Sequence, residues 1–117
     1  PDALGTLKQV VARGGRVTWV NPRRVESCAI GELLQIKPDT DVYLLAAMLC
    51  EIERGPGFDA EVTARHGKHV DALRELVRDY PAERVAPVVG VPAASIRALA
   101  LDFAAAPRAS VHASTGI

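Results

Sequence analysis

The stretch VTWVNPRRVESCAIGELLQIKPDTD, residues 17–41, decides the fold. Its first run, Val17–Val20, is too apolar and too rich in β-branched and aromatic residues for a loop, and too short for a helix. This run predicts a short buried strand. Asn21 and Pro22 follow it directly. Because both are turn-forming residues, we expect the strand to end there.

The second half of the stretch contains another apolar run and then a helix start. Leu33–Ile36 follows Gly31 and is broken by Lys37-Pro38. The segment Asp39–Asp41 supplies residue types that favour the beginning of a helix. A helix is therefore predicted from about Asp41 to Glu53. Its expected buried stripe consists of Leu44, Leu45, Met48, Leu49 and Ile52.

Helical signals also lie before and after this stretch. Asp2 is placed to cap a first helix of about ten residues, which should end at Gly14-Gly15. Helical periodicity over Phe58–Arg65 and His69–Arg78 predicts an appended helical lobe.

Prolines divide the last third of the chain. A short helix is predicted over residues 81–85, and the segment Pro87–Gly90 should end it. Pro92 starts another helix that stops before Pro107. Ala109–Ala113 is then predicted as a final strand.

Strands separated by helices imply parallel pairing with helical crossovers. We therefore expect one α/β domain over residues 1–117, a Rossmann-like three-layer sandwich with short parallel strands and an appended helical lobe. Ligands in such sheets bind beyond the carboxyl ends of the strands. Three segments lie there, Asn21–Arg24, Asp39–Asp41 and Ser114–Gly116. Turn chemistry alone favours the same residue types, so this placement leaves the function undecided.

Composition narrows the class of protein. Hydrophobic residues make up 49% and charged residues 24% of the 117, a balance typical of a globular domain. Fourteen basic residues offset fourteen acidic ones, which disfavours nucleic acid and anionic membranes as partners. Cys28 and Cys50 form no C-x-x-C pair and are expected to be two buried thiols, compatible with a cytoplasmic location. The start at Pro1-Asp2, without Met or signal peptide, suggests a trimmed chain.

Common catalytic and nucleotide-binding motifs are missing from the sequence. It contains neither G-x-G-x-x-G nor G-x-x-x-x-G-K-[ST], which counts against ordinary dinucleotide and P-loop sites. The spacing of His66, His69 and His112 predicts no metal site, so no metal ligand is assigned. No nucleophile context is apparent either. Arg23 and Arg24 are expected to lie on a solvated face. They could instead bind a phosphate.

Four segments, in order and at natural spacing, carry a family resemblance. Residues 17–26 resemble the segment of molybdopterin oxidoreductases in which a strand runs into Asp-Pro-Arg-x-Thr-Glu. Residues 35–42 resemble the Pro-Gly-Thr-Asp segment that opens a helix in that family. Residues 80–100 match the run that leads to the next strand, and Thr115-Gly116-Ile117 falls where that strand enters the cofactor site.

The resemblance implies a domain that holds the guanosine and diphosphate end of one molybdopterin guanine dinucleotide. The residues carried over are Val20, Asn21, Pro22, Arg23, Arg24, Asp39, Thr40, Asp41 and Thr115. Asp41 is expected to accept hydrogen bonds from the guanine edge, while an arginine and the helix N-terminus favour the diphosphate. Thr115 would lie toward the pterin.

Two departures from the family pattern bear on this prediction. Asn21 replaces the usual Asp and has only one side-chain oxygen to accept from ribose hydroxyls. Asp39 replaces the usual Gly and adds a negative charge near a phosphate. The alternative role for Asp39, Thr40 and Asp41 is helix capping, typically worth about 1 kcal/mol, and the two roles are compatible.

The resemblance places the chemistry outside this chain. The parent enzyme would carry molybdenum on the cofactor, and it could also contain an iron–sulfur cluster outside these residues. The protein ligand of the metal and the substrate funnel would likewise lie outside this chain. No catalytic residue is assigned, and the 117-residue piece is expected to be inactive alone and to hold no cofactor by itself. The parent is expected to be formate dehydrogenase-like, with its remaining domains and an electron-transfer subunit as partners. The alternatives are a noncatalytic interaction module docking through residues 58–78 and, less favoured, a small self-sufficient enzyme.

Overall fold

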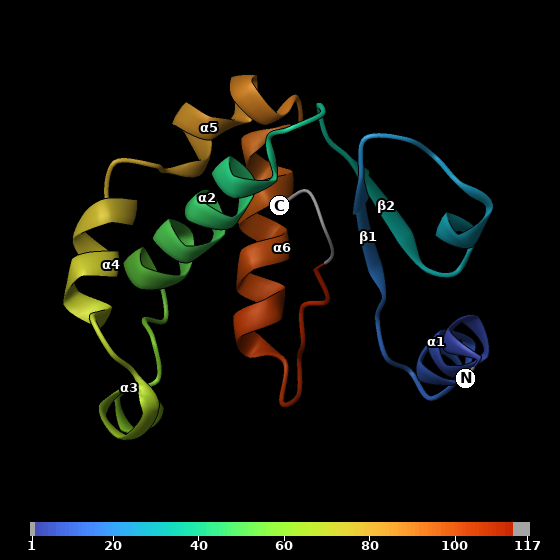
Figure 1. Cartoon of the computed structure of the whole chain (residues 1–117), viewed down its shortest axis with the longest axis horizontal. Coiled ribbons are helices and arrows are strands. Elements are labelled where there is room, and N and C mark those ends of the chain that lie inside the picture. The colour runs from blue at the N-terminus through green and yellow to red at the C-terminus, as the bar shows by residue number, and fades with distance from the viewer. Residues whose placement is uncertain (1, 114–117) are drawn as a thin grey trace. The chain divides into compact units, whose positions relative to one another are not determined.

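The structure is a computed structural model that describes residues 2–113. Its elements are α1 (Ala3–Ala12), β1 (Thr18–Asn21), the 3-10 helix η1 (Glu26–Ala29), β2 (Glu32–Gln35), α2 (Asp41–Arg54), α3 (Ala60–His66), α4 (Val70–Val77), α5 (Ala82–Val89) and α6 (Ala93–Ala105) (Figure 1). The chain divides into two compact units, Pro1–Pro38 and Asp39–Ile117, and each is described by itself.

The first unit contains the predicted strand pair. β1 and β2 run parallel, with Thr18 opposite Glu32 and Asn21 opposite Gln35. The strand predicted at 17–20 and the apolar run at 33–36 are both confirmed, each displaced by one residue. Before them, the Asp2 side chain caps α1 by accepting a 2.8 Å hydrogen bond from the Gly5 N–H, as predicted.

Gly31 sets the entry into β2. Its φ is +99°, and a Cβ atom built there would lie 2.2 Å from the Val17 carbonyl oxygen. The same carbonyl accepts the Glu32 N–H at 2.9 Å, which begins the ladder. The indole N–H of Trp19 donates to the Ile30 carbonyl at 2.6 Å. A residue without a side chain is therefore required where the connection closes onto β1.

The second unit is built around α2, which packs against α4, α5 and α6 (Figure 1). The side chains with the least exposure are Leu44, Ala47, Cys50, Val77, Ala82, Val85, Val89, Ile96 and Ala100. On α2 the buried face follows Leu44, Ala47, Met48 and Glu51, a spacing of three to four residues. Leu45, Leu49 and Ile52, predicted in the stripe, are half-buried at its flanks.

Two predictions for the last third of the chain are wrong. The helix predicted to end at Val85 continues through Pro87 to Val89. A proline inside a helix removes one N–H, but α5 continues past it and ends at Gly90, whose N–H donates to the Ala86 carbonyl at 2.8 Å. Residues 109–113, predicted as a strand, are exposed and have no regular secondary structure. A strand needs a neighbour for its backbone groups, and within residues 2–113 none lies beside this segment.

The described residues thus form a mixed α/β structure with a two-stranded parallel sheet and six α-helices. The Rossmann-like three-layer sandwich is not complete within them. Within residues 2–113 no single helix is long and apolar enough to cross a membrane; α5 and α6 pass that test only as a pair bent by 114°.

Candidate functional site

The turn that follows β1 is held by two side-chain hydrogen bonds. Asn21 Oδ1 accepts the Arg23 N–H at 2.9 Å, which closes a local turn over Pro22. Gln35 Nε2 donates to the Pro22 carbonyl at 3.1 Å, from the residue paired with Asn21 across the sheet. Asn21 Oδ1 already accepts one hydrogen bond within its own turn, whereas its amide N–H₂ has no partner in the described part of the chain and can donate to a ligand.

This turn presents two arginines to solvent. Arg23 and Arg24 are both exposed, and neither guanidinium makes an ion pair with any residue between 2 and 113. Val20, the preceding strand residue, is 37% exposed. The turn can therefore present two guanidinium groups to an anion, each able to donate two parallel hydrogen bonds, from a backbone held in place by hydrogen bonds.

The loop before α2 passes through a left-handed backbone position. Asp39 has φ +62°, one of two such non-glycine residues in the described chain. Glycine adopts this conformation freely, and Asp is among the few other residues that tolerate it. The left-handed backbone therefore explains why the molybdopterin oxidoreductase pattern has Gly at this position. The Asp39 side chain is exposed.

The carboxylates at the start of α2 do not cap the helix. Thr40 is the N-cap residue, buried, and its side chain makes no cap hydrogen bond. Elsewhere in the same chain, Asp2 caps α1 and Asp59 caps α3 by accepting from the Gly5 and Val62 N–H groups. The capping role expected for the 39–41 segment is thus absent from its side chains.

Asp41 is left with an unengaged carboxylate. It is the first residue of the 14-residue α2 and is half-buried, and no hydrogen bond or ion pair joins its side chain to the described part of the chain. The helix N-terminus favours its negative charge. Such a carboxylate can accept two parallel N–H donors, as the Watson–Crick edge of guanine presents them.

The predicted site residues fall in different units. Val20, Asn21, Pro22, Arg23 and Arg24 belong to the first unit, and Asp39, Thr40 and Asp41 open the second. Within each group the residues lie together as neighbours in one turn. Thr115, with Ser114 and Gly116, lies outside the described residues.

A buried ion network in the second unit was missed by the sequence analysis. Glu51 is 6% exposed; its Oε1 accepts Arg97 Nε at 2.7 Å, and its Oε2 accepts the Ala82 N–H at 3.1 Å. Arg97 also pairs with Glu83. The sequence did contain a signal for it, because Glu51 lies seven positions after Leu44 and therefore on the same, buried face of α2.

This network joins three helices. Ala82 is the first residue of α5, where backbone N–H groups lack helical partners, so Glu51 serves as a cap supplied by α2. Hydrogen bonding to Glu51, and then to Glu83, raises the pKa of Arg97. The pKa of Glu83 is lowered by its own backbone N–H and then by Arg97. We assign the network to holding α2, α5 and α6 together.

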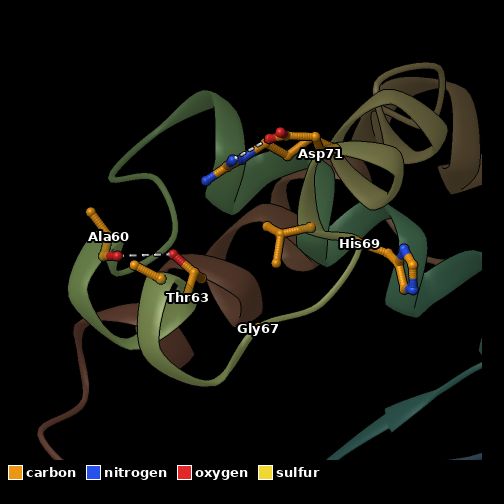
Figure 2. Close-up of a pocket in the computed structure, with 8 residues that line it drawn as sticks. Ala60, Thr63, Gly67, His69 and Asp71 are labelled. Carbon is orange, nitrogen blue, oxygen red and sulfur yellow. Dashed lines mark hydrogen bonds and ion pairs between the residues drawn. The ribbon is translucent and has the colours of Figure 1, made fainter.

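A hollow lined by residues of α3, α4 and the turn between them contains none of the predicted site residues and has a volume of about 490 Å³ (Figure 2). Most of its polar side chains are already engaged. Thr63 Oγ1 donates to the carbonyls of Asp59 and Ala60, and Asp71 pairs with Arg74 at 2.9 Å. His69 is exposed, has φ +59°, and is the one ionisable lining side chain without a partner in the described part of the chain. A single exposed histidine is no basis for a catalytic assignment.

Cys28 and Cys50 are both buried and reduced, as predicted. Burial raises the pKa of the Cys50 thiol, with Glu51 adding to the effect. Among residues 2–113, no three His, Cys, Asp or Glu side chains are grouped so that they could hold a metal ion.

Comparison with known proteins identifies relatives that match 90% of this chain. No protein-family model matches it. Acetylene hydratase of Syntrophotalea acetylenica is 29% identical over 106 residues, 90% of this chain and 14% of that protein. The F420-dependent formate dehydrogenase subunit alpha of Methanocaldococcus jannaschii is 27% identical over 106 residues, 90% of this chain and 16% of that protein.

A solved structure agrees with these relatives. Acetylene hydratase from Pelobacter acetylenicus matches with a TM-score of 0.87 and 28% identity, over 94% of this chain and 15% of that one. Both curated relatives are enzymes of the molybdopterin oxidoreductase family, so the resemblance predicted from the sequence is confirmed. The chain spans about a seventh of the length of the proteins it matches.

Proposed function

Because this chain is related to part of the molybdopterin oxidoreductases, we propose that it is a cofactor-binding domain of such an enzyme and holds the guanosine and diphosphate end of molybdopterin guanine dinucleotide. In this proposal residues 1–117 are one domain of a larger chain, and neighbouring strands of the parent complete a Rossmann-like three-layer sandwich. The cofactor supplies the redox chemistry, and this chain binds and orients it.

The unengaged carboxylate of Asp41 carries the proposal. Asp2 and Asp59 show that this chain uses aspartate to cap helices where a cap is needed. Asp41 begins α2 without doing so and keeps both oxygens for a ligand. A carboxylate that reads the N1–H and N2–H donors of guanine rejects adenine, which lacks that pair of donors.

The family resemblance assigns the arginines after β1 to the diphosphate. A diphosphate carries negative charge on several oxygens, and guanidinium forks bind such oxygens with parallel hydrogen bonds. Arg23 and Arg24 project from a turn fixed by Asn21 and Gln35, so little conformational freedom of the backbone would be lost on binding. Asn21 contributes its amide N–H₂ to the ribose in this proposal. Thr115 is assigned to the pterin side by the family resemblance alone.

The activity of the parent is part of the proposal. One relative is named a formate dehydrogenase subunit and another an acetylene hydratase. We propose a formate dehydrogenase-like parent in the cytoplasm that binds molybdenum through this cofactor and transfers electrons to a partner subunit.

The test uses the parent enzyme and measures molybdenum and acid-released guanine per protein chain. Asp41→Asn should lower both contents at least about tenfold, since charge-assisted hydrogen bonds are each worth roughly 1.5–3 kcal/mol. Asp59→Asn is the matched control, because Asn also caps a helix well, and it should retain both.

Three outcomes separate the possibilities. Cofactor lost in Asp41→Asn and kept in Asp59→Asn supports the domain and the contact. Cofactor kept in both variants removes Asp41 from the site. A parent with neither molybdenum nor guanine refutes the proposed function and favours a noncatalytic module that docks through α3 and α4, where Val62 and Leu76 are 54% and 63% exposed.

A further inference from the structure

A second, smaller hollow lies between the C-terminal ends of α2 and α4. Its volume is about 170 Å³. The residues that line it are Cys50, Glu53, Arg54, Arg74, Val77 and Arg78. Three arginines from two helices thus surround one small space, with a single carboxylate among them.

The ion pairs around this hollow do not use all of its positive charge. Glu53 is taken by Arg74, with 3.3 Å between Oε1 and Nε. Arg54 lies 3.8 Å from Glu51, whose carboxylate is already hydrogen-bonded to Arg97. Arg78 forms no ion pair within residues 2–113. Among the lining residues there are thus three guanidinium groups and one carboxylate, and Arg78 is the arginine without an ion pair in the described part of the chain.

Its walls are ordered and partly apolar. Val77 and Cys50 are 2% and 1% exposed, and burial keeps the Cys50 thiol neutral by raising its pKa. Cys50 Sγ lies 3.9 Å from the Arg78 carbonyl, which ties the end of α4 to α2. Arg74 is fixed further by Asp71 and by the Phe58 ring, 5.5 Å from its guanidinium carbon. The Arg54 side chain is 61% exposed and Arg78 is also exposed, so their guanidinium groups remain accessible to an anion from solvent.

We propose that this hollow binds a small oxyanion of the phosphate class. Arg54 and Arg78 provide the donor forks, and Arg74 adds charge from the side. Basic residues near a helix C-terminus also stabilise the helix, but that effect does not require three guanidiniums around one hollow. The hollow lies at the far end of α2 from Asp41, roughly 20 Å away along a 14-residue helix. It is separate from the proposed cofactor contact and does not depend on it.

The experiment is a titration of the ¹⁵N-labelled chain with inorganic phosphate at pH 7 and constant ionic strength. The signals followed are the arginine Nε–H groups and the backbone amides of residues 50, 53 and 77. We expect saturable shifts in these signals. Arg78→Ala should weaken binding about tenfold or more, the loss of a charge-assisted pair. Arg78→Lys should recover part of it, since the charge remains without the fork.

Arg108→Ala is the matched control, because Arg108 is an exposed arginine on the segment after α6 and does not line the hollow. It should bind phosphate like the unchanged chain. Shifts that do not saturate, that spread equally over all arginines, or that persist in Arg78→Ala overturn the proposal. Acetate binding as tightly as phosphate also overturns it, since the hollow would then prefer no phosphate-class anion.

Discussion

Replacing Glu51 tests the account of how the second unit is held together. Glu51→Ala removes a buried carboxylate that caps α5 through the Ala82 N–H and pairs with Arg97. A hydrogen bond to a charged group contributes about 1.5–3 kcal/mol, and breaking a buried pair costs about 3–5 kcal/mol. Because Arg97 is 38% exposed and regains water, we expect the lower end, a loss of about 3 kcal/mol in the free energy of unfolding.

The assay is urea unfolding followed by helical circular dichroism, with thermal unfolding as a second measure. A loss of about 3 kcal/mol corresponds to a fall in Tm of about 10 °C for a domain of this size. Glu51→Gln keeps the shape and one acceptor oxygen, so its loss should be smaller. Glu75→Ala is the matched control, because Glu75 is exposed on α4, and it should change the stability by less than about 0.5 kcal/mol.

The reasoning fails if Glu51→Ala unfolds at the same urea concentration as Glu75→Ala. It also fails if Arg97→Met destabilises the unchanged chain and the Glu51→Ala variant equally. The two residues would then act independently, and the hydrogen bond between them would not be what joins α2 to α6.

Three further predictions concern single positions. Gly31→Ala should weaken the pairing of β1 with β2 by more than about 1 kcal/mol, seen as earlier urea unfolding by the fluorescence of Trp19, the single tryptophan; an unchanged midpoint would contradict it. Asp39→Gly should be at least as stable as the unchanged chain, whereas Asp39→Ala should lose about 1 kcal/mol in the free energy of unfolding. Equal stability of the two variants would refute the left-handed conformation of residue 39. Because the pKa of Glu83 is lowered on folding, its stabilisation is present above its ordinary value of 4.5 and is lost as the pH falls further. Glu83→Gln should flatten stability against pH below about 4.5, and a slope equal to that of the unchanged chain would argue against the Arg97 pair.

Local signals predicted the parts of the fold that are local. The strand at 17–20 and the start of the helix at Asp41 depend on β-branched residues, turn residues and helix-capping types a few positions apart. The structure confirms both positions, although the strand is completed by its pairing with β2 and no side chain of the 39–41 segment caps α2.

Long-range partners decided the rest. The segment 109–113 was predicted as a strand from its place after the last helix, but residues 2–113 supply no strand that pairs with it. The helix through Pro87 persists because Val85 and Val89 are buried, and this packing outweighs one missing hydrogen bond. Glu51 was overlooked because its partners lie 31 and 46 residues away.

For the candidate site, the sequence predicted which residues stand at the strand end and at the start of α2. It did not predict which of their side chains form hydrogen bonds within the chain. Asn21 Oδ1 accepts a hydrogen bond within its own turn, while the Asp41 carboxylate has no partner in the described part of the chain. That difference comes from atomic positions, since Asn and Asp both suit turns and helix starts.

The short link between β1 and β2 has a consequence for how the chain folds in time. Parallel strands are usually joined by a long crossover, but here the connection runs only from residue 22 to residue 31. A loop of this length closes in roughly 10–100 ns, so the pairing does not wait for distant segments to collapse. The strand pair can therefore form once residues 17–36 have left the ribosome, before the helices of the second unit have emerged from it.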